Sequence, residues 1–269
     1  YSSRRQRQMC IRDSTDTDPH HHVRLEFAGW NTTVEAYDFS RSFVKSEPVH
    51  ILGAGLSGLS AAIILSKNGY DVHVHEIRSD SGARFDGDFQ GLENWTGSKD
   101  FFDEMREWGL DPDSFKSDAF SVVDLIHPDD EITQPVTDGV AFRVVERGTD
   151  EHCIDQGFKR MAIEAGATIH YGSKRGPEEC QIIAAGPKDS SAVAFGEIFH
   201  TDHPNHVSFQ LNDKLAPGAY SYLIIIDGIG LICTCLWRKQ KKSGRYLNET
   251  IAWYESHYEL NLSLIHISE

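Results

Sequence analysis

The sequence predicts an α/β fold, and three observations carry this prediction. A short apolar run, Val49–Leu52, is followed by a glycine-rich turn and then by an apolar helical pattern. The turn contains the spacing G-x-G-x-x-G in Gly53, Gly55 and Gly58. A second apolar run, Tyr70–Glu76, follows the helix and ends on a glutamate. This order of strand, turn, helix and strand is typical of a doubly wound parallel sheet.

Each part of this turn has a physical role in binding a dinucleotide. The first glycine lets the chain turn sharply, the second leaves space for a pyrophosphate, and the third lets the helix approach the strand. The free N–H groups where the helix starts, around Ala54, Leu56 and Ser57, favour phosphate oxygens. Glu76 lies 18 residues after Gly58, where such folds place the acid that hydrogen-bonds a ribose hydroxyl. We therefore predict a dinucleotide pocket formed by this turn and Glu76.

Two arginines follow the second strand. Arg78 and Arg84 lie at the edge of the predicted crevice. They either contact cofactor phosphates or are ordinary solvated arginines, and the sequence leaves both interpretations open. Glu76 would repel a 2′-phosphate, which disfavours NADP in this pocket and leaves FAD and NAD.

The two ends of the chain, residues 1–14 and 262–269, are similar to translated sequencing-adapter sequence. We leave both out of the predicted fold and expect the true termini of the protein to lie elsewhere. Residues 15–48 form an N-terminal extension of unknown role, which contains the cluster His20–His22.

Composition excludes several classes of protein. The 269-residue chain carries a net charge of −15, whereas nucleic-acid binding requires basic surface, so we expect no nucleic-acid partner. It contains no long uncharged apolar run, so we expect no transmembrane span. Cysteines 153, 180, 233 and 235 form no C-x-x-C pair, and we predict no metal site. This cysteine usage suits the reducing cytoplasm.

The rest of the chain predicts further elements. Residues 86–96 read as a polar loop, and Ser98 as the cap of a helix over 99–108 whose aromatic face is either core or the lining of a substrate pocket. Asp227-Gly228 between two apolar runs predicts a hairpin. The other expected elements are a hairpin from 120–126 and 131–136, strands at 140–146, 167–171 and 181–187, and helices at 154–165 and 248–258.

Four blocks in the correct order resemble the FAD-dependent oxidoreductases of the geranylgeranyl reductase and p-hydroxybenzoate hydroxylase superfamily. They are the glycine turn, the glutamate that ends the second strand, Val144–Arg147 with the following Ile154–Phe158, and Ile182–Gly186. Domains that bind only NAD do not require the last two blocks, so the resemblance implies FAD as the cofactor. It also implies that Arg147 reaches the pyrophosphate or ribityl region, and that Ala185 and Gly186 pack near the dinucleotide.

The resemblance implies a Rossmann-like FAD-binding domain, formed by residues 49–85 and 140–190. An inserted, mostly antiparallel β substrate region would be formed by residues 86–139 and 191–260. Leu215–Leu223 is similar to the A-P-G-G-Y stretch of geranylgeranyl-reductase-like proteins, with Ala219 in place of the second glycine. In that stretch, Tyr220 and Tyr222 either pack across strands or face the substrate. The family's last cofactor-binding block would lie beyond Glu259.

By resemblance, the reaction is hydride transfer through the flavin N5, which reduces carbon–carbon double bonds of a polyprenyl-like or other apolar substrate. The electron donor would be NAD(P)H or ferredoxin, with peripheral membrane contact as a further option. A flavin-dependent aromatic hydroxylase or monooxygenase is the alternative, and a non-catalytic dinucleotide-binding protein is the alternative of another class. The sequence identifies no catalytic residue, and its histidines at 127, 152, 170 and 200 read as scattered structural or solvated residues.

Overall fold

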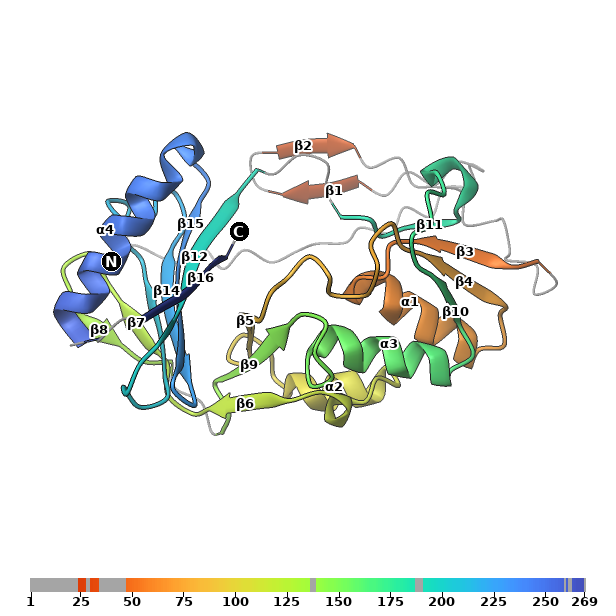
Figure 1. The fold of residues 1–269 in the computed structure, drawn as a ribbon, viewed down its shortest axis with the longest axis horizontal. Coiled ribbons are helices and arrows are strands. Elements are labelled where there is room, and N and C mark those ends of the chain that lie inside the picture. The colour runs from red at the N-terminus through yellow and green to blue at the C-terminus, as the bar shows by residue number, and fades with distance from the viewer. Residues whose placement is uncertain are drawn as a thin grey trace. The chain divides into compact units, whose positions relative to one another are not determined.

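The structure is a computed structural model that describes residues 24–27, 30–33, 47–135, 139–186, 191–258, 260 and 263–268. The chain divides into two compact units, residues 1–47 and 48–269. In the first unit, β1 (Arg24–Phe27) pairs antiparallel with β2 (Trp30–Thr33). The cluster His20–His22 lies outside the described residues. The elements discussed below belong to the second unit (Figure 1).

A parallel sheet of four strands forms the predicted dinucleotide-binding region. Its order is β10–β4–β3–β11, and every neighbouring pair is parallel. The strands are β3 (Val49–Leu52), β4 (Val72–His75), β10 (Thr168–His170) and β11 (Ile182–Ile183). Because parallel strands end at a common edge, the glycine turn, Glu76 and Ala184–Gly186 are brought to the same side of the sheet.

Two helices cover one face of this sheet, α1 (Leu56–Lys67) and α3 (Ile154–Glu164). The strands and the two helices share one hydrophobic core of nearly fully buried residues. The strands contribute Val49, Ile51, Val72 and Val74, and the helices contribute Leu59, Ile63, Phe158 and Met161. Alternate strand residues contribute to this core because successive side chains point to opposite faces. The predicted helices and parallel strands of this region are therefore confirmed, with small shifts at their ends.

A three-stranded antiparallel sheet extends from this region. Its order is β5 (Asp88–Glu93), β9 (Phe142–Arg147) and β6 (Ser117–Phe120). Residues 86–96 were expected to be a loop, but most of them pair along the full length of β9. The predicted hairpin over 120–126 and 131–136 is wrong in part. Ile126 and Leu125 pair antiparallel with Ile132 and Thr133, but residues 121–123 separate this segment from Phe120, which belongs to another sheet.

Helix α2 (Phe101–Glu107) and the short helix η1 (Pro112–Ser114) precede β6. Phe102 and Met105 of α2 are buried in the same core as α1 and α3. The cap of α2 is Asp100, whose side chain accepts a hydrogen bond from Phe102 N at 2.8 Å, and not Ser98 as expected. Phe102 and Met105 of the expected aromatic face are thus core, whereas Trp108 is 52% exposed and Phe102 also lines a cavity described below.

The largest sheet has seven strands in the order β16–β12–β15–β14–β13–β7–β8. Their bounds are β7 (Asp124–Ile126), β8 (Ile132–Thr133), β12 (Val193–His200), β13 (His206–Gln210), β14 (Ser221–Ile226), β15 (Ile229–Leu236) and β16 (Ser263–Ser268). All pairs are antiparallel except β7 with β13. The backbone of β16 pairs with β12, whereas the sequence analysis left that segment out of the fold.

The hairpin between β14 and β15 is confirmed. Asp227 and Gly228 have φ values of 50° and 81°, the left-handed backbone that a two-residue hairpin turn requires. Helix α4 (Ser243–Tyr258) packs against β15 and β12 and starts five residues earlier than expected, after the short helix η3 (Gln240–Lys242). A further short helix, η2 (Pro177–Glu179), precedes β11.

The seven-stranded sheet is buried on both faces. One face packs on α4 through Phe199, Leu223 and Tyr254. The other face packs on the three-stranded sheet through Phe142, Ile224 and related residues. The α/β fold with an antiparallel β region is thus confirmed, while the predicted domain boundaries stay a prediction.

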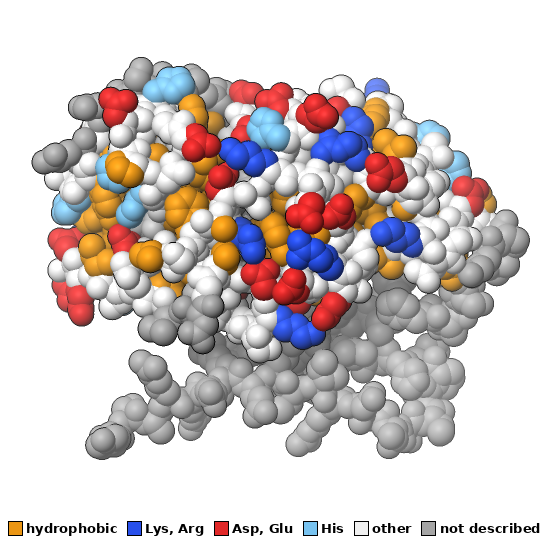
Figure 2. Space-filling view, turned by 90° about the horizontal axis from the view of Figure 1, so that it is seen from below, with side chains coloured by type: hydrophobic (Ala, Val, Ile, Leu, Met, Phe, Trp, Pro, Cys, Tyr) orange, Lys and Arg blue, Asp and Glu red, His pale blue; other side chains and the backbone are white. Residues whose placement is uncertain are grey.

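The charge of the surface and the apolar character of the helices are relevant to binding of nucleic acid and of a membrane. On the face drawn in Figure 2, Lys and Arg side chains are interspersed with Asp and Glu among the described residues and form no continuous basic patch. Among the described residues, no helix has the length and apolar character needed to cross a bilayer.

Candidate functional site

The turn after β3 is held in place by close backbone packing. Gly53 has φ of +101°, and its N–H donates to the His75 carbonyl oxygen at 2.7 Å. A Cβ on Gly53 would overlap the Ala184 carbonyl, and a Cβ on Gly58 would overlap the Gly53 carbonyl. Two of the three glycines are therefore required by contacts within the chain itself.

Gly55 differs from the other two glycines of the turn. A Cβ built on it meets no atom within 4 Å, and its φ of −82° suits any residue. It is the N-cap of α1, where no side chain caps the helix. The first turn of a helix has free N–H groups and a positive dipole end. The open space at Gly55 therefore adjoins an anion-binding position, flanked by Ala54, Leu56 and the exposed Ser57.

Glu76 is attached to this turn by hydrogen bonds. Its Oε2 accepts from Ala54 N and its Oε1 accepts from Arg78 N, each at 2.9 Å. The carboxylate thus links the end of β4 to the glycine turn. Because each carboxylate oxygen has a second lone pair, both can still accept a bond from a ribose hydroxyl. This position fits the role that the sequence assigns to Glu76.

The other predicted cofactor residues lie around this edge. Ala185 and Gly186 are exposed and follow β11, beside the carbonyl that contacts Gly53. Arg78 and Arg84 are both exposed, and the Arg84 guanidinium lies 5.8 Å from the centre of the Phe85 ring. Their contact with a cofactor stays a prediction.

Arg147 occupies a different environment from the exposed arginines, because its side chain is buried. Its Nε and Nη2 donate to the Asp155 carboxylate at 2.7 and 2.8 Å, and its Nη1 donates to Gln90 Oε1 at 2.6 Å. The guanidinium also lies 4.0 Å from the centre of the Phe85 ring. These contacts join the end of β9 to the start of α3. The guanidinium is already engaged, and its predicted contact with a cofactor remains untested.

Four histidines gather on the face of the parallel sheet opposite α1 and α3. Successive ring centres of His50, His73, His170 and His75 lie 4.9–5.4 Å apart in a closed circuit. Arg175 Nη1 lies 2.9 Å from His50 Nδ1 and 3.2 Å from His75 Nε2. Burial, followed by the charge of Arg175, lowers the pKa of His75 to about 4. His170 is therefore part of a cluster. This differs from the sequence-based expectation that it is one of several scattered histidines.

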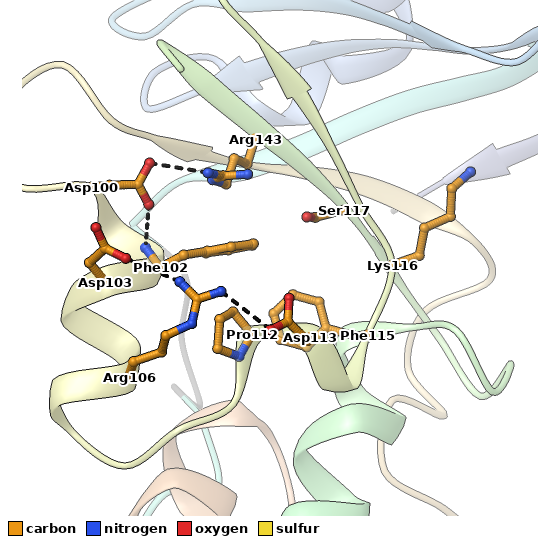
Figure 3. A pocket seen from close by; sticks show the side chains of 10 residues that line it. All are labelled: Asp100, Phe102, Asp103, Arg106, Pro112, Asp113, Phe115, Lys116, Ser117 and Arg143. Carbon is orange, nitrogen blue, oxygen red and sulfur yellow. Dashed lines mark hydrogen bonds and ion pairs between the residues drawn. The ribbon is translucent and has the colours of Figure 1, made fainter. Parts of the chain in front are cut away.

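A cavity of about 600 Å³ lies between α2, η1, β6 and β9 (Figure 3). Arg143 pairs with Asp100 at 3.1 Å, and its guanidinium lies 4.1 Å from the centre of the Phe102 ring. Arg106 pairs with Asp103 at 3.1 Å and with Asp113 at 3.3 Å. No pattern in the sequence indicates this cavity, and its charged lining is a poor match for an apolar substrate.

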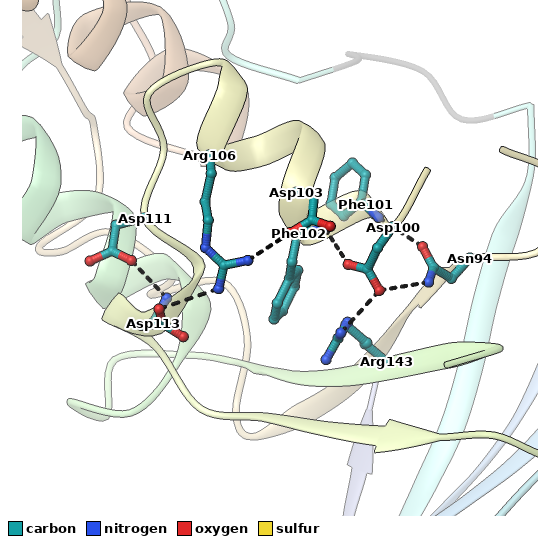
Figure 4. A network of polar contacts seen from close by, with 9 residues as sticks. All are labelled: Asn94, Asp100, Phe101, Phe102, Asp103, Arg106, Asp111, Asp113 and Arg143. Carbon is teal, nitrogen blue, oxygen red and sulfur yellow. Dashed lines mark hydrogen bonds and ion pairs between the residues drawn. The ribbon is translucent and has the colours of Figure 1, made fainter. Parts of the chain in front are cut away.

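A polar network orders one wall of this cavity (Figure 4). Asn94 accepts from Phe101 N at 2.8 Å and donates to Asp100 at 2.9 Å. Burial alone would raise the pKa of Asp100, but hydrogen bonds from Phe102 N and Arg143 hold it below its ordinary value. Asp100 is thus a fixed anion that caps α2 and positions Arg143.

Aromatic side chains form an apolar cluster between the two antiparallel sheets. Phe209 of β13 contacts Phe142 of β9 edge to face at 5.2 Å between ring centres. Phe209 also lies 5.8 Å from Tyr220 and 6.0 Å from Tyr222, and Phe142 stacks on Trp95 at 5.9 Å. Tyr222 is directly opposite Phe209 across the strands, as the packing interpretation held, while Tyr220 is 42% exposed.

Comparisons with known proteins agree with this geometry. Residues 51–88 match the model of the NAD(P)-binding Rossmann-like domain. Part of the chain is 54% identical over 39 residues to a hydroxysqualene dehydroxylase of Rhodopseudomonas palustris, which is 14% of this chain and 9% of that protein. A hydroxysqualene dehydroxylase of Sinorhizobium fredii is 50% identical over 48 residues, which is 18% of this chain and 12% of that protein. The aligned segments are thus short parts of these relatives.

Solved structures share the fold over most of the chain. A geranylgeranyl bacteriochlorophyll reductase-like protein from Thermoplasma acidophilum superposes with a TM-score of 0.61 at 18% identity, covering 82% of this chain and 65% of that chain. Aklavinone-11 hydroxylase, in a complex with FAD and aklavinone, superposes with a TM-score of 0.52 at 15% identity, covering 82% and 52%. The chain therefore shares the fold of these two proteins, one of which was solved with FAD, as the resemblance implied, and it spans less than two thirds of both structures.

Proposed function

We propose that this chain, which has the fold of the FAD-dependent oxidoreductases, binds FAD and uses it to reduce an apolar substrate. The single observation that carries the cofactor assignment is the open position at Gly55. The turn excludes side chains at Gly53 and Gly58 through its own packing, but at Gly55 the space has no protein neighbour. A pyrophosphate placed there would accept hydrogen bonds from the free N–H groups of α1.

Glu76 supports the same proposal, because its carboxylate is fixed 2.9 Å from Ala54 N and can accept from the adenosine ribose. Its negative charge disfavours a 2′-phosphate, so FAD or NAD fits better than NADP. The blocks around Arg147 and at Ala185 and Gly186 favour FAD. We further propose that Arg78, Arg84 and Arg147 contribute to the cofactor site. When bound, FAD supplies hydride transfer through N5, and the chain supplies binding and position.

The aromatic cluster supports an apolar substrate. Phe142 and Arg147 lie at opposite ends of the β5–β9 ladder, so this sheet links the cluster to the side where we propose that the cofactor binds. Phe209 and the exposed Tyr220 offer apolar ring surface to such a molecule. We propose that a polyprenyl-like or similar hydrocarbon packs here and is reduced at a carbon–carbon double bond. NAD(P)H or ferredoxin would supply the electrons, in the cytoplasm.

A flavin-dependent monooxygenase is the second candidate. The fold is shared with aklavinone-11 hydroxylase and with 2-methyl-3-hydroxypyridine-5-carboxylic acid oxygenase, the latter with a TM-score of 0.53 at 14% identity and covering 81% of this chain and 70% of that chain. The two candidates differ in their co-substrate. Oxygen consumption coupled to NAD(P)H oxidation would favour the monooxygenase, whereas anaerobic reduction of an alkene would favour the reductase.

The cofactor proposal is tested with the substitution Gly55→Ala. Because the added methyl group meets no protein atom, the variant should keep the thermal midpoint of the unliganded wild type. The methyl group would occupy the space of the pyrophosphate, so FAD affinity should fall by about tenfold or more, which is about 1.4 kcal/mol. Gly244→Ala is the matched control, because a Cβ there is equally free of contacts but lies on α4.

The measurements are the visible spectrum of the purified chain, the cofactor released on denaturation, and FAD titration followed by flavin fluorescence. A wild-type chain that takes up no FAD would contradict the flavoenzyme proposal. FAD uptake that is equal in wild type and Gly55→Ala would reject the turn as the pyrophosphate site. A nucleotide retained without any redox turnover would instead support the non-catalytic alternative.

A further inference from the structure

Three potential metal ligands meet beside the turn that joins β9 to α3. They are Glu146 at the end of β9, His152 in the turn, and Cys153 at the N-cap of α3. One donor atom from each residue, a carboxylate oxygen, a ring nitrogen and a sulfur, lie within 4.8 Å of one another. His152 Nε2 and Glu146 Oε2 are 2.9 Å apart. In the sequence, His152 is one of several scattered histidines with the pattern of structural or solvated residues, and no metal site is predicted.

The backbone explains why residues separated along the chain come together. Gly148, with φ of +150°, turns the chain at the end of β9. The turn then closes through a hydrogen bond from Cys153 N to Asp150 O at 2.9 Å, and the His152 carbonyl accepts from Lys116 N at 2.9 Å. The three donors are therefore placed by main-chain contacts that do not depend on their own side chains.

The local charges favour a cation. Arg147, next in the chain to Glu146, directs its guanidinium to Asp155 and Gln90 instead of to this cluster. Glu146 and Asp150 place negative charge near the sulfur, and a divalent cation would offset it.

We propose that Glu146, His152 and Cys153 bind one divalent transition-metal ion of the zinc type, with solvent as the fourth ligand. Sulfur, imidazole and carboxylate donors together suit Zn²⁺ and disfavour Ca²⁺ or Mg²⁺, which prefer oxygen ligands. With zinc–ligand bonds of about 2.0–2.3 Å, tetrahedral donors lie roughly 3.3–3.8 Å apart. The observed cluster reaches that spacing with shifts of about 1 Å.

The exposure of the three residues provides an entry path. The side chains of His152 and Glu146 are 46% and 25% exposed, whereas Cys153 is 1% exposed. A metal ion would approach from the solvent side and meet the sulfur last. Once bound, it would close the turn over residues 147–152 and hold the end of β9 against α3, next to the Arg147–Asp155 pair. The role is structural, and it is independent of whether the chain binds FAD.

The test is a titration of the full chain with Co²⁺, a spectroscopic substitute for Zn²⁺. Thiolate ligation produces an intense near-ultraviolet charge-transfer band that histidine and carboxylate ligands alone do not produce. We expect this band to saturate at one Co²⁺ per chain and to disappear on addition of Zn²⁺. The variant Cys153→Ser should lack the band, while Cys180→Ser, which alters a cysteine far along the chain, should keep it.

His152→Asn provides a second variant, because the histidine is partly exposed and its replacement does not disturb the core. Mutation of a residue that only hydrogen-bonds to a metal ligand typically weakens metal binding by about 10–100-fold. Loss of the ligand His152 itself should weaken Co²⁺ binding by more than that. Zn²⁺ should also raise the thermal midpoint of the wild type and not that of His152→Asn. Co²⁺ bound without the charge-transfer band, a band that survives in Cys153→Ser, or equal affinity in His152→Asn would each overturn the proposal.

Discussion

The buried pair of Arg147 and Asp155 offers a direct test of what holds β9 to α3. The two side chains are 11% and 1% exposed, and they share two hydrogen bonds of 2.7 and 2.8 Å. The substitution Asp155→Asn removes the carboxylate charge and leaves a buried guanidinium unneutralised. Breaking one partner of a buried pair costs about 3–5 kcal/mol. For a chain of this size, about 2–4 °C per kcal/mol predicts a thermal midpoint lowered by roughly 6–20 °C.

The assay is thermal unfolding of wild type and variant followed by far-ultraviolet circular dichroism. The double variant Arg147→Met with Asp155→Leu should recover most of the loss, because apolar replacement of a buried pair is often neutral. Arg106→Gln is the matched control, since its ion pairs are exposed and exposed pairs contribute little. A single variant that unfolds at the wild-type temperature, or a double variant as unstable as the single, would refute the reasoning.

The double variant also separates two roles of this arginine. If the Arg147 guanidinium serves only to bind Asp155 and Gln90, the double variant with recovered stability should bind FAD as the wild type does. If the arginine also reaches the pyrophosphate or ribityl region, FAD affinity should fall although the fold is restored. Flavin fluorescence titration distinguishes these outcomes.

Three further predictions test single groups. Gly53→Ala should severely destabilise the chain, because a Cβ there overlaps the Ala184 carbonyl and φ is +101°; a circular dichroism melt equal to wild type would contradict this. Asp100→Ala should cost about 1–2 kcal/mol through loss of the α2 cap, measured by urea unfolding, whereas the exposed Asp103→Ala should cost much less. For His75, the folded chain takes up a proton near pH 4 and the unfolded chain near 6.5, so stability should fall as pH drops from 6.5 toward 4. A His75→Gln variant should lose part of this slope, and an unchanged slope would reject the assignment.

Local patterns in the sequence were sufficient to predict those elements whose backbone conformation depends on only a few adjacent residues. The glycine turn, α1 and the Asp227-Gly228 hairpin each carry their backbone requirements in adjacent residues, and all three are confirmed. The segment that contains strand β5 has the composition of a loop, because residues 86–96 are rich in glycine and polar groups. It becomes a strand by pairing with β9, about fifty residues later in the chain, and single-sequence patterns do not show such partners.

The same distinction applies to the site. The spacing from Gly53 to Gly58 identified the turn, because backbone packing at the turn leaves no room for a Cβ at either glycine. The histidine cluster comes from three strands, and only His73-x-His75 was visible as a pair on one face of β4. Glu146, His152 and Cys153 can likewise be found in the sequence, but the sequence does not show that they lie close together. Their approach depends on the turn at Gly148, which the sequence analysis did not resolve.

The identity of the substrate depends on which of two surfaces it meets. An apolar molecule in the cavity beside α2 would have to desolvate the Arg143–Asp100 pair and the ion pairs of Arg106, and desolvating charges without replacing their partners is costly. At the aromatic cluster, the same molecule would displace water only from rings such as Phe209 and Tyr220. Burial there gains about 25 cal/mol per Å² of apolar surface. The proposed polyprenyl-like substrate would therefore bind at the aromatic cluster, whereas turnover of a small ionic substrate would move the proposed site to the charged cavity.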